Sequence, residues 1–210
     1  MVARRFESFM AEATGNLEPI RVMIVDDHDI VRMGLRVLIE HSPSLCFVGE
    51  ASDGREAILL YPEVQPHIVL MDISMPNIDG VEAIRAIRRI DEQARIIVLS
   101  NYTEGGLVRA AFEAGAISYL GKEVGQHLLV RAIEDAHSGK PTLAPNAAQE
   151  LIEALRSSEE SADKLTPAEI EILRYVSQGL SNIEIAERLV VSTSTIKKHV
   201  SSILTKLAVN

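Results

Sequence analysis

The sequence has one cysteine, no tryptophan and no long apolar run, and each absence excludes a class of protein. A single cysteine, Cys46, cannot form a disulfide within the chain and suits a reducing compartment, so we expect a cytoplasmic location and a buried, unreactive thiol. No apolar stretch approaches the ~18 residues that cross a bilayer, and residues 1–18 have no apolar core of the signal-peptide kind. We therefore expect no membrane partner and no secretion.

The net charge of −9 is spread unevenly along the chain. Residues 165–210 contain five Lys or Arg and four Asp or Glu, whereas residues 1–164 contain 16 basic and 26 acidic residues, a net charge of −10. A polyanion is repelled by an acidic surface, so only the C-terminal part is expected to approach nucleic acid.

Short apolar stretches alternate with amphipathic ones between Arg21 and His137. The apolar stretches are rich in Val and Ile without polar alternation, which is typical of parallel strands covered on both faces. They are RVMIV, CFVGE, HIVLMD, RIIVLS and AISYL, and helices are predicted to begin near residues 29, 54, 79, 104 and 126. Five strands with right-handed crossovers predict an α/β, flavodoxin-like, doubly wound parallel sheet in the order 2-1-3-4-5.

Composition divides the rest of the chain. Residues 1–18 are expected to be a mobile arm, residues 19–139 to form the α/β domain, and residues 140–164 to form a helix and a flexible polar linker that contains SSEESADK. Residues 165–210 have helical periodicity throughout and are predicted to form a small all-α domain.

Polar side chains occur where the apolar strands end. Asp26 and Asp27 follow the first predicted strand, Asp72 and Ser100 end the third and fourth, and Lys122 follows the fifth. Because the carboxyl ends of parallel strands meet at one edge of a sheet, we expect these groups to converge. Three carboxylates repel one another unless a cation neutralises them, and Mg²⁺ prefers such oxygen ligands. Together with the lysine, the cluster predicts phosphoryl transfer onto a carboxylate, with Asp72 as nucleophile and Ser100 and Lys122 gripping the phosphoryl group.

These residues, together with Pro76, Gly80 and the run AGAISYLGK, resemble bacterial response-regulator receiver domains over about residues 20–140. The resemblance implies that Asp72 accepts a phosphoryl group from a sensor histidine kinase. It implies a switch pair, in which the Ser100 hydroxyl turns toward the phosphoryl group and the Tyr119 ring turns inward. The Mg²⁺ ligands that it implies are Asp26, Asp27, Asp72 and the backbone carbonyl of Ser74.

Two positions depart from the receiver pattern, and a third suggests a refinement. Gly121 stands where the family usually has a bulky apolar residue and Glu123 where many receivers have proline, so we expect a looser loop around Lys122. Tyr102 lies two residues beyond Ser100, where its bulk is expected to shield the acyl phosphate from water.

The C-terminal segment has the features of a helix-turn-helix. Thr166, Pro167 and Glu169 predict the start of one helix, and Ser181 the start of the next. After a three-residue turn, a third helix is predicted from about Thr193 to residue 207. Its outer face is small, hydroxylated and basic, with no acidic residue between 188 and 210, which favours contact with duplex DNA over a merely solvated basic face.

The runs LTPAEIEIL, GLSNIEIAERL and STSTIKKHVSSILTKL resemble the LuxR-type helix-turn-helix, and its pairing with a receiver resembles the NarL/FixJ class of transcription factors. The resemblance implies double-stranded DNA as a partner and a homodimer after phosphorylation. The family pattern continues past Asn210 with a further amphipathic helix, so we expect weaker cooperativity between half-sites than in a relative that has this helix. The predicted DNA contacts are Ser181, Asn182, Thr193, Ser194, Thr195, Lys197, Lys198, His199, Ser201 and Lys206.

The sequence thus predicts a transcription factor controlled by phosphorylation of Asp72, and not an enzyme. On this interpretation the unphosphorylated receiver covers the recognition helix, and phosphorylation releases it, forms dimers, or does both. One alternative is a phosphohydrolase, although Ser74 stands where such enzymes usually have a second acid. A small-molecule sensor is another, but four Phe and four Tyr offer little to line a pocket. The last alternative is a receiver that acts without phosphorylation. The presence of all five site residues argues against it.

Overall fold

The computed structural model describes residues 18–101, 105–140, 142–145, 147–149, 152 and 165–208. Within these residues five parallel strands form one sheet in the order β2-β1-β3-β4-β5, which confirms the predicted flavodoxin-like topology. The strands are β1 (Ile20–Val25), β2 (Leu45–Ala51), β3 (Ile68–Met71), β4 (Ile96–Leu99) and β5 (Ser118–Leu120).

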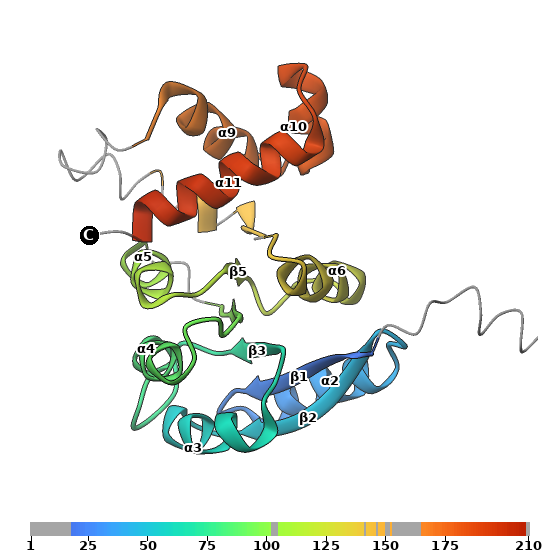
Figure 1. The fold of residues 1–210 in the computed structure, drawn as a ribbon, viewed down its shortest axis with the longest axis vertical. Coiled ribbons are helices and arrows are strands. Elements are labelled where there is room, and N and C mark those ends of the chain that lie inside the picture. The colour runs from blue at the N-terminus through green and yellow to red at the C-terminus, as the bar shows by residue number, and fades with distance from the viewer. Residues whose placement is uncertain are drawn as a thin grey trace, which may run out of the picture.

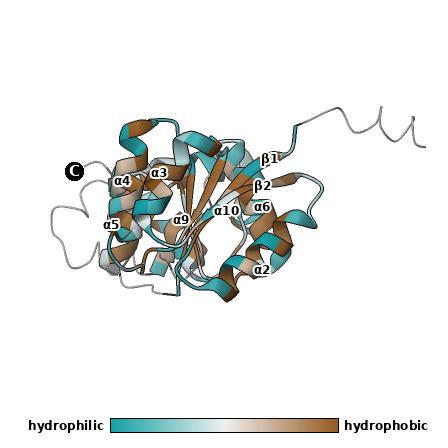
Figure 2. Cartoon of the chain, turned by 90° about the horizontal axis from the view of Figure 1, so that it is seen from below, coloured by the Kyte–Doolittle hydropathy of each residue, from teal (hydrophilic) through white to brown (hydrophobic). Residues whose placement is uncertain are grey.

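Helices cover both faces of the sheet because each central strand is apolar on both sides. On one face Met23 and Val69 pack with α3 and α4, and on the other Val22 and Leu70 pack with α2 and α6. Figure 2 shows the hydrophobic strands enclosed between these helix layers. The helices are α2 (Asp29–Glu40), α3 (Gly54–Val64), α4 (Gly80–Ile90), α5 (Gly105–Ala114) and α6 (Gln126–His137).

Three further helices follow, α9 (Pro167–Ser177), α10 (Asn182–Leu189) and α11 (Thr193–Ala208). The predicted start signals are confirmed, because Thr166 and Ser181 each form a capping box with the glutamate three residues later. Val190 ends α10 in the left-handed conformation, with φ of 56°, which makes the turn between α10 and α11 tight.

The C-terminal helices pack against the α/β domain through α11. Figure 1 shows α11 lying across the molecule beside α5, and α11 and α5 are in contact. A cavity of about 470 Å³ lies between the two parts of the chain; its lining includes Arg95, Phe112 and Ala136 on one side and Ser201 and Leu204 on the other. The recognition helix of the predicted helix-turn-helix is therefore part of an interface within the chain.

The segment after α6 pairs with the edge of the sheet. The Tyr119 amide donates to the Thr142 carbonyl at 3.2 Å, and the Ala144 amide donates to the Tyr119 carbonyl at 3.0 Å. Residues 145, 147–149 and 152 of the predicted linker helix are helical. The arm, except for Glu18, the polar run at 157–164 and Tyr102 lie outside the described residues.

Two remaining expectations concern single features. Cys46 lies on β2, an edge strand, and is half-buried, so the expected full burial of its thiol is wrong. The described residues contain no helix that combines the length and the hydrophobicity of a transmembrane span.

Candidate functional site

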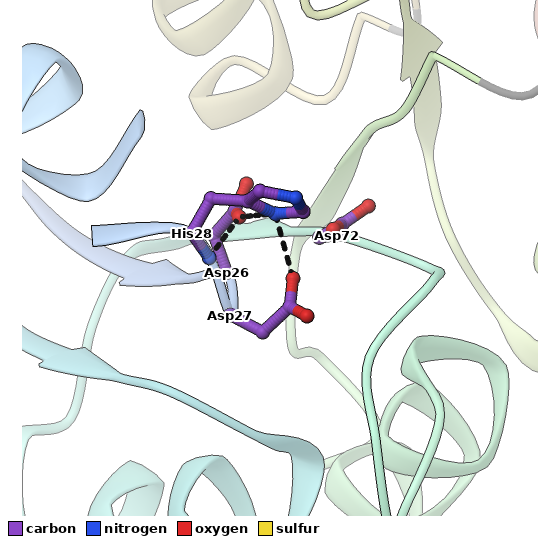
Figure 3. A group of neighbouring side chains, drawn as sticks. All are labelled: Asp26, Asp27, His28 and Asp72. Carbon is purple, nitrogen blue, oxygen red and sulfur yellow. Dashed lines mark hydrogen bonds and ion pairs between the residues drawn. The ribbon is translucent and has the colours of Figure 1, made fainter. Parts of the chain in front are cut away.

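The carboxyl ends of the central strands bring the predicted acidic residues together. Val25 of β1 pairs with Met71 of β3, so the next residues along each strand, Asp26 and Asp72, stand side by side. Figure 3 shows Asp26, Asp27 and Asp72 around one space. Both Asp26 and Asp72 are almost fully buried, with exposures of 1% and 2%, and such carboxylates need a compensating charge.

Lys122 supplies this compensating charge. Its Nζ donates to Asp72 Oδ2 at 2.8 Å and lies 2.7 Å from Asp26 Oδ2. Burial raises the pKa of the Asp72 carboxyl, and Lys122 offsets only part of that rise. For Lys122 burial acts in the lowering direction, but its bonds to Asp26 and Asp72 outweigh it and raise the pKa of the ammonium. Lys122 therefore stays protonated, and it lies beside the Asp72 carboxylate, which is poorly solvated.

The donor set at this edge fits a divalent ion. One ligand atom each of Asp26, Asp27, His28 and Asp72 lies within 4.8 Å of all the others. Asp27 Oδ1 is buried and accepts no hydrogen bond from the described residues, although His28 Nδ1 is 2.7 Å away. A buried carboxylate oxygen in this condition is costly unless a cation binds it. The residues present thus suit Mg²⁺ or a related ion.

His28 is a member of this group that the sequence analysis did not select. His28 directly follows the two aspartates and is the N-cap residue of α2, so its place in the sequence was a usable signal. The His28 amide donates to Asp26 Oδ1 at 2.9 Å, and the ring Nδ1 lies 3.1 Å from the same oxygen.

Gly80 allows the start of α4 to approach the backbone of Asp72 closely. A Cβ added to Gly80 would stand 2.0 Å from the Asp72 carbonyl oxygen, so the first residue of α4 has to be glycine for this approach. The Ser74 amide donates to Asp72 Oδ1 at 3.3 Å. The role of the Ser74 carbonyl as a metal ligand stays a prediction.

Ser100 directly follows β4, the neighbour of β3, and Tyr119 lies on β5, one strand further from Asp72; both side chains are fully buried. Tyr119 pairs with Val98 of β4, and its ring centroid is 6.4 Å from that of Phe112 on α5. The ring is fully buried in this structure, and its movement on phosphorylation stays a prediction.

The loop around Lys122 contains both departures from the receiver pattern. A Cβ on Gly121 would stand 2.7 Å from a carboxylate oxygen of Glu123, so the glutamate side chain occupies the space that the glycine leaves. The expected looseness of this loop stays a prediction.

The ten predicted DNA contacts are distributed over several environments. Lys198 is exposed and forms no side-chain hydrogen bond or ion pair within the described residues. Lys197 Nζ donates to Asp135 of α6 at 3.0 Å, and Ser201 lines the cavity between the domains. Part of the predicted DNA face is therefore in contact with the α/β domain. The others are Ser181, exposed in its capping box, Asn182, Thr193 and His199, which are half-buried, and Ser194 and Thr195, whose hydroxyls lie near that of Ser192.

Lys206 has an internal partner instead. Its Nζ donates to both carboxylate oxygens of Glu169 at 2.7 and 2.8 Å, and the Ser202 hydroxyl donates to the same carboxylate. Burial acts to raise the pKa of Glu169, but Lys206, Thr166 and Ser202 outweigh it and lower the pKa to about 2. This pair joins α9 to α11, and a phosphate contact by Lys206 stays a prediction.

Comparison with known proteins gives the class of this chain. Residues 22–134 match the response regulator receiver domain, and residues 163–210 match the bacterial regulatory proteins of the luxR family. The chain belongs to the response regulators of two-component systems that join a receiver domain to a LuxR-type DNA-binding domain.

Individual relatives resemble almost the whole chain. The transcriptional regulatory protein LiaR of Bacillus subtilis is 40% identical over 194 residues, which are 91% of this chain and 92% of LiaR. The nitrate/nitrite response regulator protein NarL of Escherichia coli K12 is 35% identical over 196 residues, 91% of each chain. A solved complex of the response regulator RcsB with DNA is 29% identical, with a TM-score of 0.60 over 92% of this chain and 94% of RcsB. The two family matches and these relatives identify the chain as a DNA-binding transcription regulator.

Proposed function

We propose that phosphorylation of Asp72 by a sensor histidine kinase controls whether α11 can bind double-stranded DNA. The observation that best supports this is the Asp72 carboxylate itself, 2% exposed and held by Lys122 Nζ at 2.8 Å beside two further aspartates. A purely structural aspartate at a strand end needs no such assembly of charges.

The chemistry follows from the arrangement of these groups. An oxygen of Asp72 attacks the phosphorus of a phosphohistidine or acyl phosphate, the bond to the donor breaks, and an aspartyl phosphate forms. Lys122 then binds a phosphoryl oxygen, and the Ser100 hydroxyl donates to another. Asp26, Asp27, Asp72 and the Ser74 carbonyl would hold Mg²⁺, which when bound neutralises the phosphoryl charge.

The proposed signal passes from β4 and β5 to α11. In this hypothesis Ser100 moves toward the phosphoryl group and alters the packing of Tyr119. Tyr119 is connected in two ways to the interface between the α/β domain and the helical domain. Its ring packs with Phe112, which lines the cavity facing α11, and its backbone holds the segment that leads to the helical domain. A change at Tyr119 thus shifts the population toward chains whose α11 is free.

The freed helical domain is proposed to bind duplex DNA as a homodimer. Lys197 and Ser201 leave the receiver and join Lys198 on one basic face, which suits phosphate and guanine acceptors. The relative RcsB has been solved on DNA, which supports the same partner here.

Acetyl phosphate tests the phosphorylation step without a kinase. Incubation with acetyl phosphate and Mg²⁺ should add one phosphoryl group by intact mass, and borohydride trapping should place it on Asp72. Asp72→Asn, which keeps the size of the side chain, should gain no mass. A phosphoryl group that persists in Asp72→Asn would contradict the proposal.

A further inference from the structure

We propose that His137 makes the docking of α11 on the receiver sensitive to acid. His137 is the last residue of α6, and protonation of its imidazole ring loosens this end of the helix, and with it the contacts that hold α11. The inference rests on the proposed function, because it needs a receiver that covers α11, but it adds a second input that acts far from the phosphorylation site.

The His137 ring is confined at the end of the sheet opposite to the acidic site. It is half-buried, and its centroid lies 5.1 Å from that of His67, which directly precedes β3. The Nδ1 atom of His137 is buried and forms no hydrogen bond within the residues that the structure describes. A positive charge on a buried ring that has no acidic partner is costly.

The groups that face this ring from the neighbouring elements are basic. His67 and Arg95, which precedes β4, both act against a positive charge on His137. The His67 ring is held in place, because its Nδ1 accepts a hydrogen bond from the Arg21 amide at 3.2 Å. The Arg21 guanidinium donates to two backbone carbonyls at the end of α3. These elements thus surround His137 with groups that disfavour its protonation.

The acidic residues nearest to His137 on α6 have other partners. Glu134 accepts from the Ser44 hydroxyl at 2.7 Å, and Asp135 accepts from Lys197 of α11 at 3.0 Å. A histidine in the last turn of a helix ordinarily gains from protonation, because the helix dipole places negative charge there. At His137 burial, followed by the neighbouring basic groups, instead lowers the pKa of the ring. The packing therefore favours the neutral imidazole.

The same end of α6 belongs to the surface on which α11 docks. Asp135, two residues before His137, binds Lys197, and Ala136 and Gly139 line the cavity between the two domains. Arg95 lines this cavity as well, so a proton on His137 adds repulsion within the docking surface itself. Movement of the end of α6 into solvent relieves this repulsion and withdraws the contacts to α11.

The direction of the effect follows from proton linkage. The docked state holds the pKa of His137 below its ordinary value of 6.5, whereas a released helix end exposes the ring to water. The docked state therefore binds fewer protons, so docking is complete above about pH 6.5 and weakens as the pH falls through the lowered pKa. For each pH unit between the two pKa values, the docking constant falls by up to about tenfold.

Energy transfer between dyes on the two domains measures docking directly. In a Cys46→Ala chain, dyes at the exposed positions of Arg89→Cys on α4 and Glu187→Cys on α10 report the separation of the domains. Between about pH 7.5 and about pH 5.5 the transfer should fall in the unphosphorylated chain and persist in the same chain with His137→Gln. His127→Gln is the matched control, because His127 is exposed on the same helix; this chain should open with acid as the parent does.

Arg95→Met gives a readout that a merely structural role would not move. It removes one of the cations that act on His137, so it should raise the pKa of the His137 ring and reduce the fall in energy transfer. Nuclear magnetic resonance of the histidine ring protons measures this pKa in both chains. A His137 pKa in the docked parent chain that is not below its ordinary value would overturn the inference.

The outcomes separate this inference from the proposed function. Acid opening that is equal with and without His137→Gln would overturn the role of His137, and so would energy transfer that stays constant with pH in every chain. Acetyl phosphate and Mg²⁺ are then added at about pH 7.5. If this treatment leaves the transfer unchanged while acid lowers it, control by phosphorylation fails and the acid response stands. If the treatment lowers the transfer and acid does not, the proposed function stands and this inference fails.

Discussion

The Lys197 ammonium of α11 lies 3.0 Å from the Asp135 carboxylate of α6, so a predicted DNA-contacting side chain is paired with the receiver domain. One ammonium cannot keep this geometry and also bind a phosphate or a guanine edge. The prediction that Lys197 contacts DNA therefore implies that DNA and the receiver compete for the same face of α11, with Asp135 in the place of a phosphate.

Replacing Asp135 should weaken this competition. Asp135→Ala removes the receiver's half of the pair and leaves Lys197, the predicted DNA contact, intact. The pair is partly solvated, so its loss is worth about 0.5–1 kcal/mol, and unphosphorylated Asp135→Ala should bind duplex DNA about two- to fivefold more tightly. Fluorescence anisotropy at low salt measures this change.

Glu134→Ala is the control for Asp135→Ala. Glu134 carries the same charge on the same helix, but its carboxylate accepts from Ser44 and not from α11. If both variants gain affinity equally, the effect is one of net charge, and the ion pair plays no part in covering α11.

Gly80→Ala should displace the backbone at Asp72, the proposed phosphorylation site. The added Cβ would stand 2.0 Å from the Asp72 carbonyl oxygen, so either α4 or the strand end must move. We expect a loss of about 1–3 kcal/mol in stability and slower phosphorylation by acetyl phosphate. Thermal unfolding followed by circular dichroism and a time course of intact mass measure the two effects.

Gly34→Ala is the matched control in the same domain. Nothing lies within 4 Å of the Cβ that it adds in α2, so this variant should be more stable by about 0.5–1 kcal/mol and be phosphorylated at the wild-type rate. A Gly80→Ala chain as stable and as reactive as Gly34→Ala would refute the close approach at Asp72.

The Glu169–Lys206 pair should make the helical domain sensitive to acid. The pKa of Glu169 is lowered to about 2, so its stabilising effect is complete above the ordinary carboxyl pKa and is lost as the pH falls from there through about 2. Glu169→Gln should therefore be less stable than wild type at about pH 7, and the gap should close toward about pH 2. Thermal melts of both chains across this range measure the gap.

Lys206→Met provides the check on the partner. It removes the cation that lowers the pKa of Glu169 and should shift the loss of stability to higher pH. A gap between wild type and Glu169→Gln that stays constant with pH would show that the carboxylate does not titrate in this way.

Local patterns predicted the fold because each depends on near neighbours in the sequence. Unbroken runs of Val and Ile predicted strands buried on both faces, and the capping residues Thr166 and Ser181 predicted two helix starts to the residue. The acidic site was predictable because parallel strands place their carboxyl ends together, which brings Asp26 and Asp72 side by side.

Contacts between distant elements could not be predicted in the same way. The pairing of Lys197 with Asp135 and of Lys206 with Glu169 joins segments whose relative placement no sequence periodicity gives. The basic pattern of α11 was visible, but not which of its cations have acidic partners. The full burial of the Tyr119 ring depends likewise on packing against Phe112.

The affinity of the full chain for DNA before and after phosphorylation tests the central claim most directly. A duplex selected from a random pool by the phosphorylated chain is titrated with untreated chain, with chain treated with acetyl phosphate and Mg²⁺, and with treated Asp72→Asn. Treatment should tighten binding of the wild type and leave Asp72→Asn at the untreated value. Equal affinity of the untreated and phosphorylated wild type would contradict the account.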